Sequence, residues 1–218
     1  MPCPDCGKPT HECRGITANL LENNASALIH LAPYYPKRQT VTHNVIFEVK
    51  HHADGRLFAC LAEELTRELF AEWERTYFNR EKDEIVVVYS PRSRKSLAAK
   101  GFDQSAMLAR AVERKLTDAG YSVKKERKPM IKRVRGVEQK DLDEAERAEN
   151  AKRSFVATKA IAAVQGRHVI LIDDLATTCA TLSTCTKLCY EAGAAGVICA
   201  VIAKTDRVRR PANIPLNI

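Results

Sequence analysis

The residues from Val169 to Leu182 carry the side chains in this chain that are best suited to chemistry. An apolar run ends in two adjacent carboxylates, Asp173 and Asp174, and threonines and small residues then lead into an expected helix. In an open α/β sheet, the ligand crevice lies at the carboxyl ends of the strands. The first amides of a helix lack partners within it, and the helix dipole favours an anion there. The segment therefore combines acceptors for hydroxyls or hydrated Mg²⁺ with donors for a phosphate.

The loop after the two carboxylates would form the anion site. Its threonine hydroxyls are donors, and the small side chains leave the approach open; the loop residues are Ala176, Thr177, Thr178, Cys179, Ala180 and Thr181. Ribose 5-phosphate offers vicinal hydroxyls beside a phosphate, so we expect a ligand of this kind. A plainer interpretation is a polar strand end followed by a helix cap. The order and spacing of the two features together favour the ligand site.

A second group of candidate ligands lies at the N-terminus. Cys3 and Cys6 are separated by two residues, which lets both thiolates reach one tetrahedral zinc ion. His11 and Cys13, separated by one residue, form a less regular second half. Two interpretations stay open: a structural zinc site, or a degenerate site whose thiols are simply reduced. Cysteines further along are expected in the core, namely Cys185, Cys189 and Cys199.

Strands that alternate with helices must position these residues. Apolar β-branched runs predict buried strands at 85–89, 168–172 and 197–203. Helical spacing of apolar residues predicts helices within 34–50, 54–80, 103–120 and 141–151, and between the threonine loop and Gly193. This alternation predicts an α/β fold with a doubly wound, mostly parallel sheet. We expect one domain over 34–218, preceded by the Cys/His-rich segment 1–33.

Charge is distributed unevenly along the chain. The net charge is +8, with basic residues concentrated between Lys124 and Arg135 and acidic residues between Glu138 and Glu149. A solvated loop and helix face would explain both stretches, and contact with phosphates or nucleic acid would explain the basic one.

The sequence contains no apolar run long enough to cross a bilayer, and the first residues lack the basic start and apolar core of a signal peptide. We therefore expect a cytoplasmic protein without a membrane span.

The segment 169–182 resembles the PRPP-binding motif of type I phosphoribosyltransferases, an apolar strand followed by Asp-Asp and a Thr-Thr-Gly-x-Thr loop. The chain is similar in particular to the ComF family of competence-associated, amidophosphoribosyltransferase-like proteins. That family has a segment like Arg-Gly-Phe-Asn-Gln before a helix, matched here by Lys100-Gly101-Phe102-Asp103-Gln104. A second family segment is matched by Gln139, Leu142, Arg147, Asn150 and Phe155, and a paired-cysteine zinc segment by Cys3 and Cys6.

The resemblance implies a type I phosphoribosyltransferase fold with a helical hood, and PRPP and Mg²⁺ as ligands. Asp173 and Asp174 would be the catalytic pair that holds the ribose hydroxyls, while the loop 176–181 would hold the 5-phosphate. The loop after the first strand would hold pyrophosphate with Mg²⁺, through Ser90, Arg92, Arg94 and Lys95. Flexible-loop residues would close over the site, namely Arg133, Arg135 and Gln139. Pyrophosphate would leave the anomeric carbon through an oxocarbenium-like state. Surface solubility is the alternative role for the basic residues of the first loop.

Cys179 stands where the family's phosphate loop has glycine. Glycine permits backbone angles and close ligand approach that a side chain obstructs. If the position needs a positive φ, Cys179 should weaken phosphate binding or reshape the loop. A redox-sensitive thiol is another interpretation, since a helix N-terminus lowers a thiol pKa.

Three classes of function remain open. The first is a phosphoribosyltransferase that transfers the 5-phosphoribosyl group. The second is a non-catalytic PRPP- or nucleotide-binding protein of DNA uptake, with single-stranded DNA bound by the basic stretch and by the C-terminal Arg207, Arg209 and Arg210. The third is a degenerate domain kept for protein contacts. The sequence leaves the acceptor and the oligomeric state open.

Overall fold

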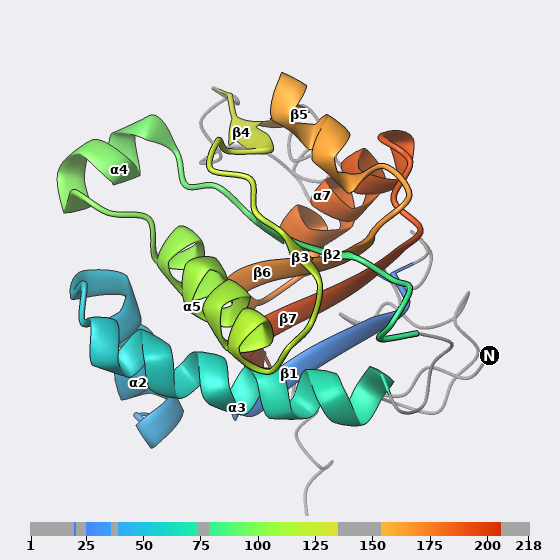
Figure 1. Cartoon of the computed structure of the whole chain (residues 1–218). Coiled ribbons are helices and arrows are strands. Elements are labelled where there is room, and N and C mark those ends of the chain that lie inside the picture. The colour runs from blue at the N-terminus through green and yellow to red at the C-terminus, as the bar shows by residue number, and fades with distance from the viewer. Residues whose placement is uncertain (1–19, 21–24, 36–38, 74–78, 135–153, 206–218) are drawn as a thin grey trace, which may run out of the picture.

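The computed structural model describes residues 20, 25–35, 39–73, 79–134 and 154–205. Seven strands, five α-helices and one 3₁₀ helix follow one another there (Figure 1). In chain order they are β1 (Ala27–Tyr34), α2 (Val41–His51), α3 (Gly55–Trp73), β2 (Ile85–Tyr89), α4 (Arg94–Lys100), α5 (Gln104–Asp118), β3 (Val123–Lys124), β4 (Ile131–Arg133), β5 (Phe155–Ala157), η3 (Lys159–Val164), β6 (His168–Ala176), α7 (Ala180–Glu191) and β7 (Gly196–Thr205).

The main sheet has five strands in the order β1-β7-β6-β2-β3, and every neighbouring pair is parallel. Its central strands β2, β6 and β7 are buried along nearly their whole length, as the apolar runs predicted. The carboxyl ends of these strands meet at one edge of the sheet because all run in the same direction. The predicted α/β fold with a mostly parallel sheet is confirmed.

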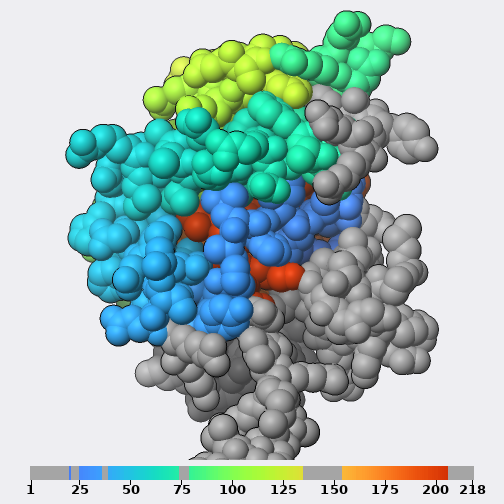
Figure 2. All heavy atoms as spheres, turned by 90° about the horizontal axis from the view of Figure 1, so that it is seen from below, coloured from blue at the N-terminus to red at the C-terminus, as the bar shows by residue number. Residues whose placement is uncertain are grey.

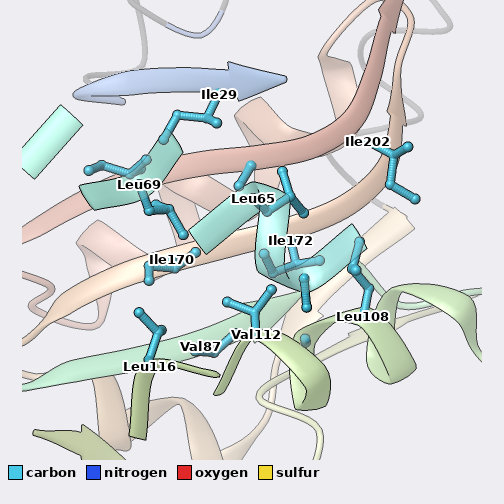
Figure 3. Packing of buried hydrophobic residues seen from close by; sticks show 14 of the residues in the cluster. Ile29, Leu65, Leu69, Val87, Leu108, Val112, Leu116, Ile170, Ile172 and Ile202 are labelled. Carbon is cyan, nitrogen blue, oxygen red and sulfur yellow. The ribbon is translucent and has the colours of Figure 1, made fainter. Parts of the chain in front are cut away.

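Helices cover both faces of this sheet (Figure 1). On one face, α2, α3 and α5 pack against alternate strand residues, including Val87, Ile170 and Ile172 (Figure 3). On the other face, α7, η3 and the small antiparallel pair β4–β5 pack against the intervening residues, including Val88 and Leu171. Alternate side chains of a strand point to opposite faces, so each buried strand contributes to both cores.

Local signals set the ends of the helices that flank the site. The Asp103 carboxylate accepts a hydrogen bond from the Ala106 amide at 3.2 Å and caps α5. Gly120 and Gly193 follow α5 and α7 with φ values of 82° and 88°, which glycine adopts without steric cost. The three cysteines expected in the core, Cys185, Cys189 and Cys199, are buried.

The edge strand β1 is absent from the sequence-based expectations. It pairs in parallel with β7 from Ala27 to Tyr34 and lies at the surface beside α3 (Figure 2). Its residues 27–33 fall within the segment set apart as 1–33, yet they belong to the main sheet. The half-buried pattern of β1 and its Pro33 give a weak strand signal.

Other boundaries also differ from the expectations. Tyr34 ends a strand rather than beginning a helix, and Arg80 lies in a turn rather than in α3. The buried stripe of α3 runs through Phe58, Ala62, Leu65 and Leu69, while Leu57 and Leu61 are only partly buried. The expected helix 141–151 lies outside the described residues. Among the described helices, none combines the length and apolar character that a membrane span requires.

Candidate functional site

The site lies at the carboxyl ends of two neighbouring strands, β2 and β6, whose following helices pack on opposite faces of the sheet. After β2 the chain continues through α4 to α5, which packs on one face, and after the adjacent β6 it continues to α7 on the other. Such a divergence opens a crevice at the carboxyl ends of the two strands. A cleft of about 330 Å³ lies there, lined among others by Ser90, Arg92, Asp173, Asp174 and Thr181.

Asp173 is half-buried on β6 and accepts hydrogen bonds from α5 and from its own strand. Its Oδ1 accepts hydrogen bonds from the Ser105 hydroxyl at 3.1 Å and from the Asp174 amide at 2.9 Å. Burial, together with the neighbouring Asp174 charge, raises the pKa of Asp173 from the usual 3.8 to about 7, although hydrogen bonds from Ser90 and Ser105 oppose the shift. Asp173 can therefore exchange a proton near neutral pH.

Asp174 is buried and has a different set of partners. The Gln104 amide Nε2 donates to its Oδ2 at 2.7 Å, and the Lys50 Nζ lies 3.9 Å from the same oxygen. Lys50 is at the end of α2, where its own carbonyl accepts a hydrogen bond from the Lys100 Nζ at 2.8 Å. Helices α2 and α5 thus reach this carboxylate, and α4 holds the end of α2 in place.

The sequence placed both carboxylates at the end of the strand, whereas β6 continues past them to Ala176. A turn over 177–179 then leads into α7, with Thr177 and Thr178 exposed and Cys179 buried. The residues from Leu175 to Leu182, with Asp173, bound a hollow of about 30 Å³, the size of one or two water molecules. The loop has the expected order of elements, but its interior is small.

Cys179 has a φ of 58° and a ψ of 8°, and it is the one non-glycine residue with positive φ in the described part of the chain. This left-handed conformation costs a residue with a Cβ on the order of 1 kcal/mol. The position therefore has the backbone geometry that glycine favours, and the Cys179 side chain packs into the core beneath α7. The chain keeps the loop conformation despite the cysteine.

The loop after β2 is fixed by Asp103. The second oxygen of that carboxylate accepts a hydrogen bond from the Arg92 amide at 2.9 Å, while the guanidinium of Arg92 donates to the Ser96 hydroxyl at 3.0 Å. Ser90 and Arg92 line the cleft. Arg94 and Lys95, in the first turn of α4, are exposed and are not part of the cleft wall.

Of the three flexible-loop candidates, Arg133 lines the cleft, and its guanidinium lies 5.4 Å from the Phe155 ring centroid. Arg135 and Gln139 lie outside the described residues, as do the proposed zinc ligands Cys3, Cys6, His11 and Cys13. Over the ranges that the structure describes, no three His, Cys, Asp or Glu side chains gather as a metal site.

Lys50, Gln104 and Ser105 contact the carboxylates but were not singled out as site residues from the sequence. Gln104 was visible only as the end of the Lys100–Gln104 match, and Ser105 follows it directly. Lys50 carries no local signal, because a lysine at a helix end is common on protein surfaces. Tertiary packing brings it to Asp174 from more than a hundred residues away in the chain.

Comparison with known proteins does not assign the chain. No protein-family model matches it, and no curated protein matches it.

The raised pKa of Asp173 predicts a pH dependence of stability. Between about pH 4 and 7 the folded chain holds a proton that the unfolded chain releases, so the free energy of unfolding falls as pH rises through this window. Asp173→Asn removes this proton. We expect its free energy of unfolding to rise relative to wild type with increasing pH, by at most about 1.4 kcal/mol per pH unit.

Urea denaturation from pH 4 to 8 measures this difference. Asp118→Asn is the matched control, because Asp118 is exposed at the end of α5. If the free energy of unfolding changed with pH in the same way for wild type and Asp173→Asn, the raised pKa of Asp173 would be contradicted.

The backbone of Cys179 predicts an unusual order of stability. Cys179→Gly and Cys179→Ala both lose the thiol, but only alanine keeps a Cβ in the left-handed conformation. We expect the glycine variant to be more stable than the alanine variant by about 1 kcal/mol in thermal or urea denaturation.

Cys185, inside α7, supplies the control pair. There the order should reverse, with Cys185→Gly less stable than Cys185→Ala by about 1 kcal/mol. The same order at both positions would contradict a requirement for positive φ at residue 179.

Proposed function

We propose that this chain is a PRPP-binding, phosphoribosyltransferase-like protein that binds or transfers a 5-phosphoribosyl group with Mg²⁺. One observation carries the proposal: the paired carboxylates of β6 and the turn into α7 lie in one cleft with the loop after β2. Carboxylates that accept hydroxyl donors thus lie beside amides and hydroxyls that bind a phosphate.

In this proposal Asp173 and Asp174 hold the ribose hydroxyls. The 5-phosphate binds at the mouth of the loop, over the exposed Thr177 and Thr178, because the hollow inside the loop is too small for more than one or two waters. The first turn of α7 lines the same hollow, and a helix N-terminus favours the negative charge of a phosphate.

A second anionic group would lie against the basic wall of the cleft. Lys50, Arg92 and Arg133 line it, and the Arg92 Nε is buried without a hydrogen-bond partner among the described residues. This wall suits a pyrophosphate group, because guanidinium and ammonium groups pair strongly with phosphate oxygens. Asp173 and Asp174 fit Mg²⁺, which proteins commonly bind through one or two carboxylates together with substrate phosphates. When bound, Mg²⁺ neutralises phosphate charge.

The proposal predicts that PRPP binding depends on the two carboxylates. In calorimetric titration of PRPP with Mg²⁺, wild type should bind, and the Asp173→Asn/Asp174→Asn variant should lose at least tenfold in affinity. The reason is that amides lack the negative charge with which carboxylates hold a cation and strengthen hydrogen bonds from hydroxyls. Asp118→Asn is the control for an aspartate outside the cleft.

Equal binding by the double variant would place the ligand elsewhere. If wild type bound neither PRPP, ribose 5-phosphate nor nucleoside monophosphates, the proposal would be wrong. Pyrophosphate release on addition of a base or amine would assign turnover, and binding without release would favour a sensing role.

A role in single-stranded DNA contact is the second candidate. The side chains of Lys125, Arg127, Lys128 and Lys132 are exposed, and Arg133 continues this basic strip to the cleft. Phe155, the aromatic residue beneath Arg133, is buried, so this strip would contact the backbone rather than stack on bases. Such binding weakens steeply with salt, which fluorescence anisotropy measures directly.

A further inference from the structure

A hydrogen bond to Asp174 sets which end of the Gln104 amide faces that carboxylate. Gln104 begins α5, is only 5% exposed and lines the cleft wall. Its Nε2 donates to Asp174 Oδ2 at 2.7 Å. A carboxylate only accepts, so the NH₂ group faces Asp174 and the amide oxygen faces away from it.

The Gln104 Oε1 has no hydrogen-bond partner among the residues that the structure describes. Buried polar atoms are paired almost without exception, and an unpaired acceptor destabilises the fold until a donor reaches it. Of the donors that line the same cleft, the Ser105 hydroxyl donates to Asp173, and an Arg92 guanidinium nitrogen donates to Ser96. The Arg92 Nε is itself unpaired and therefore does not donate to Gln104. A hydroxyl of a ligand in this cleft would supply the donor that the Gln104 oxygen lacks.

We propose that Gln104 is a specificity-determining residue whose Oε1 accepts a hydrogen bond from a sugar hydroxyl of the bound ligand. This inference rests on the proposed binding of a 5-phosphoribosyl group. The terminal torsion of glutamine is broad, so the amide can turn toward a hydroxyl in the cleft while its nitrogen stays near Asp174.

The contacts of Gln104 and Lys50 with Asp174 leave one oxygen of this carboxylate for a second sugar hydroxyl. Gln104 and Lys50 both approach its Oδ2, which leaves Oδ1 for the ligand. One amide oxygen and one carboxylate oxygen would then accept the two hydroxyls of a vicinal pair. A sugar that lacks one of these hydroxyls leaves a buried acceptor unpaired, which is the basis of strong discrimination.

Calorimetric titration with three sugars tests this role: ribose 5-phosphate, 2-deoxyribose 5-phosphate and 3-deoxyribose 5-phosphate, each with and without Mg²⁺. Wild type should prefer ribose 5-phosphate about tenfold over at least one deoxy analogue. Gln104→Met removes the acceptor and should bring this preference close to one. Gln104→Glu keeps an acceptor and should keep the preference, with weaker binding of all three sugars because a second negative charge lies beside Asp174.

Gln165→Met is the matched control, since Gln165 is exposed in the turn before β6, at the opposite edge of the sheet. Thermal denaturation establishes that each variant is folded, and Gln104→Ala replaces Gln104→Met if the longer side chain does not fit.

A uniform loss of affinity for all three sugars in Gln104→Met would overturn the proposal, because it would leave Gln104 only a supporting role for Asp174. A wild type without preference, or a variant that keeps the full preference, would overturn it as well. If Gln104→Met still preferred ribose 5-phosphate but its affinity no longer depended on Mg²⁺, the donor to the Gln104 oxygen would be a metal-bound water. That result would reject a sugar hydroxyl as the donor. Failure of wild type to bind any of the sugars would instead refute the proposed function.

Discussion

Two neighbouring carboxylates on the central strand β6 impose the main constraint on this molecule. Adjacent negative charges in a partly buried place repel each other and lose their hydration, which raises the pKa of Asp173 to about 7. Neighbouring residues supply hydrogen-bond donors and a positive charge that offset the free-energy cost of burying the two carboxylates. Ser105 and the Asp174 amide donate to Asp173, while Gln104 and Lys50 approach Asp174.

This arrangement gives the two aspartates different roles. Asp174 has a donor amide and a cation beside one oxygen. Asp173 has a pKa near neutrality. Carboxyl groups with a raised pKa are a recurring feature of functional sites. The contacts to Asp174 depend on α2 and α5, which pack against the same face of the sheet.

Cys179 shows how the fold overrides a local preference. The turn from β6 into α7 requires a left-handed residue, and the sequence supplies a cysteine in place of the easier glycine. Burial of its side chain in the core with Leu182 and Cys185 gives a contact that glycine could not make. The loop therefore keeps its course with the cysteine in place, and in the proposed function the phosphate binds at its exposed mouth.

The sequence by itself determined the alternation of buried strands and amphipathic helices, and with it the α/β class. Continuous apolar runs such as Val169–Ile172 and caps such as Asp103 are local signals, because burial and capping depend on neighbours in the chain. It also identified the segment from Asp173 to Thr181 as the candidate site. The spacing of residues in the sequence did not predict that this segment lies where the connections after β2 and β6 diverge.

Only the tertiary structure decided which side chains surround the carboxylates. Lys50 and Gln104 reach Asp174 from two helices that precede β6 by long stretches of chain, and β1 joins the sheet from the N-terminal side through its pairing with β7. Strand order and helix packing bring these residues together, and neither leaves a periodic pattern in the sequence. The physical reason is that long-range contacts depend on how complete elements pack, whereas local propensity and hydrophobic periodicity report only on the element itself.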